Sequence, residues 1–104
     1  MPFELKYTPE AQAQYNALEA DKSMSVQFTA VKKALRFLAA DPTHPGLHTH
    51  KYDSLEGPEK SVAFEAYAQN KTPGAYRIFW CYYPPDRSLV ALGTITIIAI
   101  TPHP

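Results

Sequence analysis

Residues 61–83 read SVAFEAYAQNKTPGAYRIFWCYY and contain two runs of alternating side chains on either side of a turn. Alternation with a period of two is typical of a β-strand with one buried face. The NKTPG segment between the runs is rich in turn-forming residues, so the two runs are expected to form adjacent antiparallel strands over residues 61–69 and 75–83. The face expected to carry the core comprises Val62, Phe64, Ile78 and Trp80.

The chain that follows predicts a further strand over residues 89–100, after a turn at residues 84–87. β-branched residues dominate this segment, and Gly93 indicates a bulge or bend within it. The last four residues, Thr101 to Pro104, are expected to end the pairing because their two prolines cannot donate to a ladder.

The N-terminal part predicts a strand followed by two helices. Residues 3–7 alternate, and Thr8 and Pro9 are a typical cap and first residue of a helix over residues 9–20. A second helix is expected to end near Ala40, because Asp41-Pro42 disfavours helical geometry. Its apolar stripe has helical spacing and comprises Met24, Phe28, Val31, Leu35 and Leu38.

These elements predict an α+β fold of one domain, residues 1–104. An N-terminal strand, a helical hairpin and a three-stranded antiparallel meander follow one another, with the helices packed on one face of a single, mainly antiparallel sheet. Residues 42–60 are rich in Pro, Gly, His and charge, and are expected to form an ordered loop, with one short strand within it as an open alternative.

Composition restricts the classes of partner and the cellular locations that are expected for this chain. The 104 residues carry no net charge, so a nucleic-acid partner would require a local basic patch. No apolar run is long enough to cross a membrane, and the N-terminus has no secretion signal. A single cysteine, Cys81, is consistent with a reducing compartment and is expected to be an inert thiol. A cytoplasmic protein is therefore expected.

The sheet face opposite the core is unusually aromatic for a solvent-facing surface, and Arg77 lies within it. It comprises Glu65, Tyr67, Arg77, Phe79, Cys81 and Tyr83. One interpretation is a structural ion pair between Glu65 and Arg77 beneath a partly covered surface. The alternative is a concave site or a docking surface for a partner chain, in which the guanidinium grips an anion.

Histidines provide the other candidate groups. His48 and His50 are two residues apart, so an extended backbone points both the same way, and Lys51 is adjacent. Solvated loop histidines are the alternative interpretation. The pair lacks the further ligands of a metal site, so neither a metal nor another cofactor is expected. His103 lies between two prolines, which hold its backbone extended.

Three local strings are typical of one protein family. Residues 34–42 read ALRFLAADP and run into HPGLHTHKY, residues 44–52; residues 75–78 read AYRI; and residues 97–100 read IIAI ahead of a terminal histidine. In these strings the chain resembles the RelE/ParE superfamily of toxins from bacterial type II toxin–antitoxin modules. The resemblance extends over nearly the whole chain. It implies a RelE-like fold and a cognate antitoxin as partner.

The resemblance implies alternative activities. RelE-like members cleave translated mRNA in the ribosomal A site, whereas ParE-like members inhibit DNA gyrase; a diverged protein-interaction domain without catalysis is a third possibility. For a nuclease, attack of a ribose 2′-hydroxyl on the next phosphate requires a base, an acid and a cation. In that case Arg77 stabilises the phosphate, His103 is the acid, and His50 or Lys51 is the base or gives electrostatic help. His48 is an alternate, and Tyr67 or Tyr83 stacks on a base.

Overall fold

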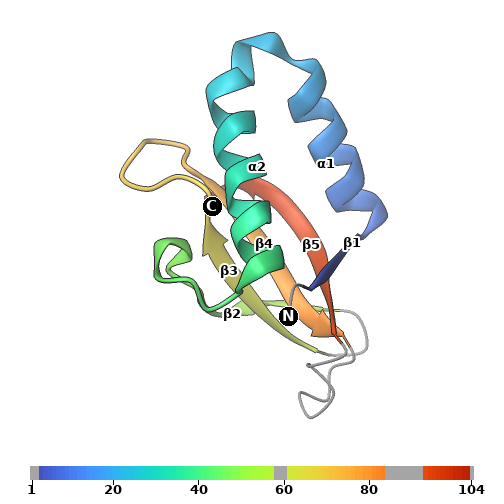
Figure 1. Cartoon of the computed structure of the whole chain (residues 1–104). Coiled ribbons are helices and arrows are strands. Elements are labelled where there is room, and N and C mark those ends of the chain that lie inside the picture. Colours follow the sequence, from blue (N-terminus) through green and yellow to red (C-terminus); the bar gives the residue numbers. More distant parts are fainter. Residues whose placement is uncertain (1–2, 58–60, 84–92, 104) are drawn as a thin grey trace.

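One mixed β-sheet organises the chain, and two helices cover one of its faces (Figure 1). The computed structural model describes residues 3–57, 61–83 and 93–103. The elements are β1 (Glu4–Tyr7), α1 (Pro9–Ala20), η1 (Lys22–Met24), α2 (Ser25–Ala40), η2 (Pro45–Leu47), β2 (His50–Glu56), β3 (Val62–Tyr67), β4 (Tyr76–Tyr83) and β5 (Thr94–Pro102). The strand order β1-β5-β4-β3-β2 is antiparallel except for β1, which pairs with β5 in parallel.

The helical hairpin is confirmed. Thr8 caps α1, its Oγ1 accepting from the amide of Ala11 at 3.1 Å. The 3-10 turn η1 reverses the chain into α2, which ends at Ala40 as expected. Among the described residues, no helix is both long and apolar enough to span a bilayer.

The main core lies between the helices and the sheet, as the periodicity predicts. Most of its large, fully buried side chains come from α2, β4 and β5, namely Val31, Leu38, Ile78, Trp80, Ile95 and Ile97. Val62 departs from the expectation: it is the first residue of β3 and is 53% exposed. A second apolar cluster lies on the other sheet face and contains Ala63, Phe79, Cys81, Ile98 and Ala99.

The segment expected as a loop before the meander contains a strand that is longer than the short one considered there. β2 is seven residues long and pairs with β3 at the sheet edge, which makes the meander four-stranded. The register shifts between Lys51 and Glu56, and the half-buried Tyr52 and Leu55 are therefore three residues apart instead of two. That irregularity, in an otherwise exposed strand, removes the alternation by which a strand is recognised.

β5 also differs from the expectation, at both ends and in the middle. Its bulge is at Ile98, because Trp80 pairs with Ile97 and Phe79 with Ala99, whereas Gly93 precedes the strand. Pairing continues past Thr101, and the amide of His103 donates to Ala75 O at 2.7 Å. Alternate amides point to opposite sides of a strand, so the nitrogen of Pro102 points away from β4. The expected turn at residues 84–87 and the start of the predicted strand at residues 89–92 lie outside the described residues.

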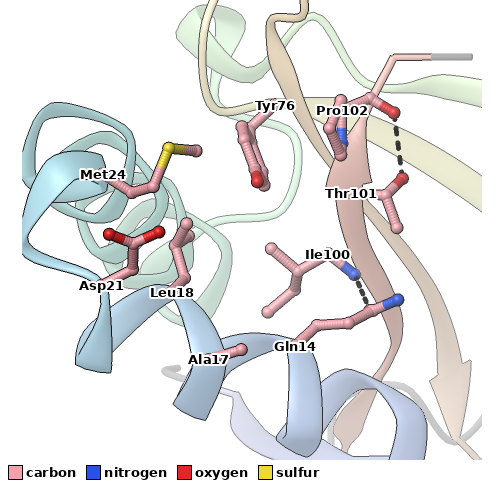
Figure 2. A pocket seen from close by; sticks show the side chains of 9 residues that line it. All are labelled: Gln14, Ala17, Leu18, Asp21, Met24, Tyr76, Ile100, Thr101 and Pro102. Carbon is pink, nitrogen blue, oxygen red and sulfur yellow. Dashed lines mark hydrogen bonds between the residues drawn. The ribbon is translucent and has the colours of Figure 1, made fainter.

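The last pair between β1 and β5 is Tyr7 with Ile97. Beyond it, backbone groups at the edge of β5 form hydrogen bonds with the side chains of Thr8 and of helix α1. Thr8 Oγ1 donates to Ile98 O at 2.8 Å, and Gln14 Oε1 accepts from the amide of Ile100 at 2.6 Å (Figure 2). Helix α1 is thereby fixed against the sheet by polar contacts as well as by packing.

Replacing Gln14 with alanine is expected to lower the free energy of unfolding by about 1–2 kcal/mol, because the part-buried amide of Ile100 loses its acceptor. Urea denaturation measures this. Gln12→Ala is the matched control on the same helix, since Gln12 is exposed and its Nε2 donates to Asn16, which is also exposed. Equal stabilities of the two variants would contradict the role given to Gln14.

Candidate functional site

A buried carboxylate lies on the sheet face away from the helices. Glu65 is 2% exposed and alternates along β3 with Phe64 and Ala66, whose side chains pack in the main core. A carboxylate in such a place is unfavourable unless charged or hydrogen-bonding groups surround it. Its partners therefore define the site.

Three side chains from three other strand segments meet at Glu65. Oε1 lies 2.7 Å from His50 Nε2, and Oε2 lies 3.1 Å from His103 Nδ1 and 3.5 Å from Arg77 Nε. His50 is the direct register partner of Glu65 on β2, and Arg77 pairs with Tyr67, one step diagonal on β4. His103 reaches Glu65 because β5 stays paired with β4 as far as Pro102 and the amide of His103 then donates to Ala75 O. We call Glu65, His50, His103, Arg77 and Tyr67 the Glu65 cluster.

The hydrogen bonds of His50 constrain its protons. Its Nδ1 is 2.9 Å from His48 O, which can only accept, so this nitrogen carries a proton. Its Nε2 contacts a carboxylate oxygen, and that contact also requires a proton. An imidazolium paired with ionised Glu65 satisfies both contacts, and in that state His50 is a proton donor.

His103 is held differently. Its Nδ1 contacts the Glu65 carboxylate, while Nε2 has no partner among the described residues. The side chain is 49% exposed, compared with 2% for Glu65. With the proton on Nδ1, the neutral ring leaves a lone pair on Nε2 facing out of the carboxylate contact, so His103 is equipped to accept a proton.

Arg77 is buried, at 6% exposure, and is fixed by several contacts. Its Nη1 donates to Gln69 O, and its guanidinium lies 3.7 Å from the centroid of the Tyr67 ring. Nε lacks hydrogen-bond geometry toward Glu65, so their contact is electrostatic. Nη2 has no partner among the described residues. Arg77 therefore takes part both in the expected ion pair with Glu65 and in the candidate site.

The other candidates are placed as follows. The ring of His48 lies 5.1 Å from that of Tyr67, so His48 borders the Glu65 cluster, of which Tyr67 is a member. Lys51 is exposed and pairs in register with Phe64, which places it on the opposite face from His50. The structure does not bring Lys51 to the carboxylate. Tyr83 ends β4, and its side chain lies outside the described part of the chain.

Sequence reasoning included Glu65 only as a structural partner of Arg77, not as the centre of a site. The available signal was a single carboxylate on a strand whose flanking residues are largely apolar. Within the described residues, no group of three or more His, Cys, Asp or Glu is arranged to hold a metal ion.

Cys81 is on the same face but does not offer a nucleophile. It is 2% exposed, and burial raises the pKa of its thiol, an effect that a hydrogen bond with Ser61 partly offsets. The thiolate needed for nucleophilic chemistry is therefore disfavoured.

A pocket of about 330 Å³ lies elsewhere, between the end of α1 and the last residues of β5 (Figure 2). Its walls are largely apolar, and two of its polar side chains already have partners. Gln14 Oε1 is bonded to Ile100, and Asp21 Oδ1 accepts from the amide and hydroxyl of Ser23. It therefore lacks the convergent polar groups found at the Glu65 cluster.

The element order and sheet arrangement are those of a RelE/ParE-like toxin fold. A YoeB/ParE toxin from Agrobacterium tumefaciens superposes with a TM-score of 0.66 over 98% of this chain and 100% of that one, at 10% identity. A YoeB dimer from Staphylococcus aureus gives a TM-score of 0.60 over the full length of both chains, also at 10% identity. No protein-family model and no curated protein sequence matches the chain. The similarity establishes the fold.

Proposed function

We propose that this protein is the toxin of a type II toxin–antitoxin module and that it cleaves translated mRNA, as RelE-like toxins do. The observation that carries the proposal is the Glu65 cluster, in which one buried carboxylate orients two half-exposed imidazoles beside an arginine. Paired proton-transfer groups beside a cation are what metal-independent RNA cleavage requires.

In the proposed reaction, the ribose 2′-oxygen forms a bond to phosphorus while the bond from phosphorus to the 5′-oxygen breaks. His103 Nε2 accepts the proton of the 2′-hydroxyl. His50, exchanging the His48 carbonyl for substrate, gives its Nδ1 proton to the departing 5′-oxygen. The products are a 2′,3′-cyclic phosphate and a 5′-hydroxyl. Nη2 of Arg77 stabilises the charge that develops on the phosphoryl oxygens.

These roles reverse those suggested by the sequence, in which His103 was the acid. The reversal rests on hydrogen bonding: His50 Nδ1 faces a carbonyl oxygen and so donates in that contact, whereas His103 Nε2 has no partner among the described residues. Glu65 contacts both rings and so stabilises whichever imidazole is protonated at each stage.

The absence of net charge is compatible with this proposal because three of the ten Lys and Arg residues lie close together on one element. Helix α2 presents Lys32, Lys33 and Arg36 as exposed side chains and contains no acidic residue. Such a local patch gives phosphate attraction without a basic chain overall. We propose a cytoplasmic location, with the ribosome and mRNA as targets and a cognate antitoxin as partner.

Inducible expression in a bacterial host tests this proposal. We expect growth arrest with new mRNA 5′ ends inside translated regions, and loss of both effects with His103→Ala. Arrest with intact messages and a DNA-damage response would instead favour inhibition of gyrase, the alternative implied by the resemblance to ParE-like members. A protein that causes neither effect would be an interaction domain.

A further inference from the structure

A small pocket, of about 210 Å³, is lined by residues of α2, by one residue of η2 and by the end of β3. Lys33 and Tyr67 are among the side chains that form its walls. Tyr67 is the last residue of β3 and contacts Arg77 in the Glu65 cluster, whereas Ala68, which also lines the pocket, packs against the main core. The pocket therefore lies where the Glu65 face of the sheet meets the side covered by α2. We call it the Lys33 pocket.

Lys33 gives this pocket a positive charge that is not neutralised. The side chain is exposed, and its Nζ lies 5.6 Å from the ring centroid of Phe37, which is part of the same pocket wall. Among the described residues, Lys33 has no ion-pair partner, and no acidic side chain lines the pocket. The ammonium group is therefore available to form a charge-assisted hydrogen bond with an anion.

The shape of the pocket favours a small anionic group. The rest of its wall is made of residues without long side chains, so the backbone of a ligand can come close: Ala30, Ala34, Gly46 and Ala68. Its volume is below that of ordinary small-molecule pockets, which begin at about 300 Å³. A phosphodiester group with part of its ribose suits this space better than a whole nucleotide does.

We propose that the Lys33 pocket binds a phosphodiester group of RNA that flanks the scissile one, with Lys33 Nζ donating to a phosphoryl oxygen. That this RNA is the substrate rests on the proposed function. Tyr67 provides the connection, because its ring lies 3.7 Å from the guanidinium of Arg77 and also lines the pocket. Arg77 then contacts the scissile phosphate and Lys33 a flanking phosphate, and two such contacts fix the register of the strand in the site.

Fluorescence anisotropy with a labelled 2′-O-methyl RNA hexanucleotide, at low ionic strength, tests this contact; the methyl groups block the attacking hydroxyl. Each phosphate in turn is replaced by an uncharged methylphosphonate. At one position we expect binding to weaken by about two- to fivefold, the usual effect of losing an exposed ion pair, and this loss should disappear in Lys33→Ala. The variant should keep the fold, because Lys33 is exposed and alanine favours a helix.

Lys32→Ala is the matched control. Lys32 is exposed on the same helix, and its Nζ also lies near an aromatic ring, 4.7 Å from the centroid of Phe28, but it lines a different pocket. This variant removes the same charge from α2, so it should weaken the binding of all the hexanucleotides alike. The loss caused by each methylphosphonate should therefore be the same as in the wild type.

The inference is overturned if the wild type does not bind the hexanucleotide, if every loss persists in Lys33→Ala, or if Lys32→Ala abolishes the same loss. A hexaglutamate peptide that binds as tightly as the RNA, and also depends on Lys33, would overturn the phosphodiester as ligand. Because cleavage is not measured, the two proposals can fail separately. Dependence on Lys33 without cleavage in cells would overturn the reaction alone, and cleavage in cells without this dependence would overturn this inference alone.

Discussion

Replacing Glu65 with alanine is expected to lower the free energy of unfolding by about 3–5 kcal/mol, the cost of leaving a buried charge without its counter-charge. Arg77 is only 6% exposed and would then be beside two imidazoles with no carboxylate between them. Urea denaturation of the wild type and the variant measures the difference. Because the pair is buried, added salt should change it little.

Two further variants make that result interpretable. Glu56→Ala removes an exposed carboxylate from β2 and is expected to change stability by less than about 0.5 kcal/mol. Combining Glu65→Leu with Arg77→Met removes both charges and should recover most of the lost stability, since apolar replacement of a buried pair is often neutral. If Glu65→Ala were as stable as Glu56→Ala, the carboxylate would not hold the site together.

His103→Ala is expected to slow cleavage of ribosome-bound mRNA by about 10²–10⁴-fold, the usual contribution of a positioned acid or base. Its fold should remain intact, because the side chain is 49% exposed and lies at the end of β5. Single-turnover cleavage rates and a thermal melt of the same sample separate the two effects.

Lys51→Ala is the informative control for His103→Ala. The resemblance to the toxin superfamily places Lys51 among the catalytic candidates, but its register partner is Phe64 on the other sheet face. Its cleavage rate should stay close to that of the wild type. A large loss with Lys51→Ala, and little with His103→Ala, would contradict the site described above.

The sequence predicts those parts of the fold that rest on local periodicity and caps. Helix α1 begins and ends where Thr8, Pro9 and Asp21 indicate, and alternation assigns Arg77 to the face away from the helices. These features depend on neighbours a few residues away, so a single sequence is sufficient to find them.

The remaining features depend on partners far away in the sequence. β2 is irregular and mostly exposed, so neither hydropathy nor alternation indicates it. Without β2, the register that places His50 opposite Glu65 cannot be derived. His103 reaches the same carboxylate only because the edge nitrogen of Pro102 points away from β4, a geometry that the proline alone does not reveal.

The most direct test of the central claim uses RNA in which sulfur replaces the 5′-oxygen at the cleavage site, because a thiolate leaves without needing a proton. On this substrate His50→Ala should cleave at nearly the wild-type rate, although it is slow on normal RNA, and His103→Ala should remain slow on both. A recovered cleavage rate of His103→Ala, or a cleavage rate of His50→Ala that does not recover, would contradict the account. In that account His103 is the base, His50 is the acid, and both contact Glu65.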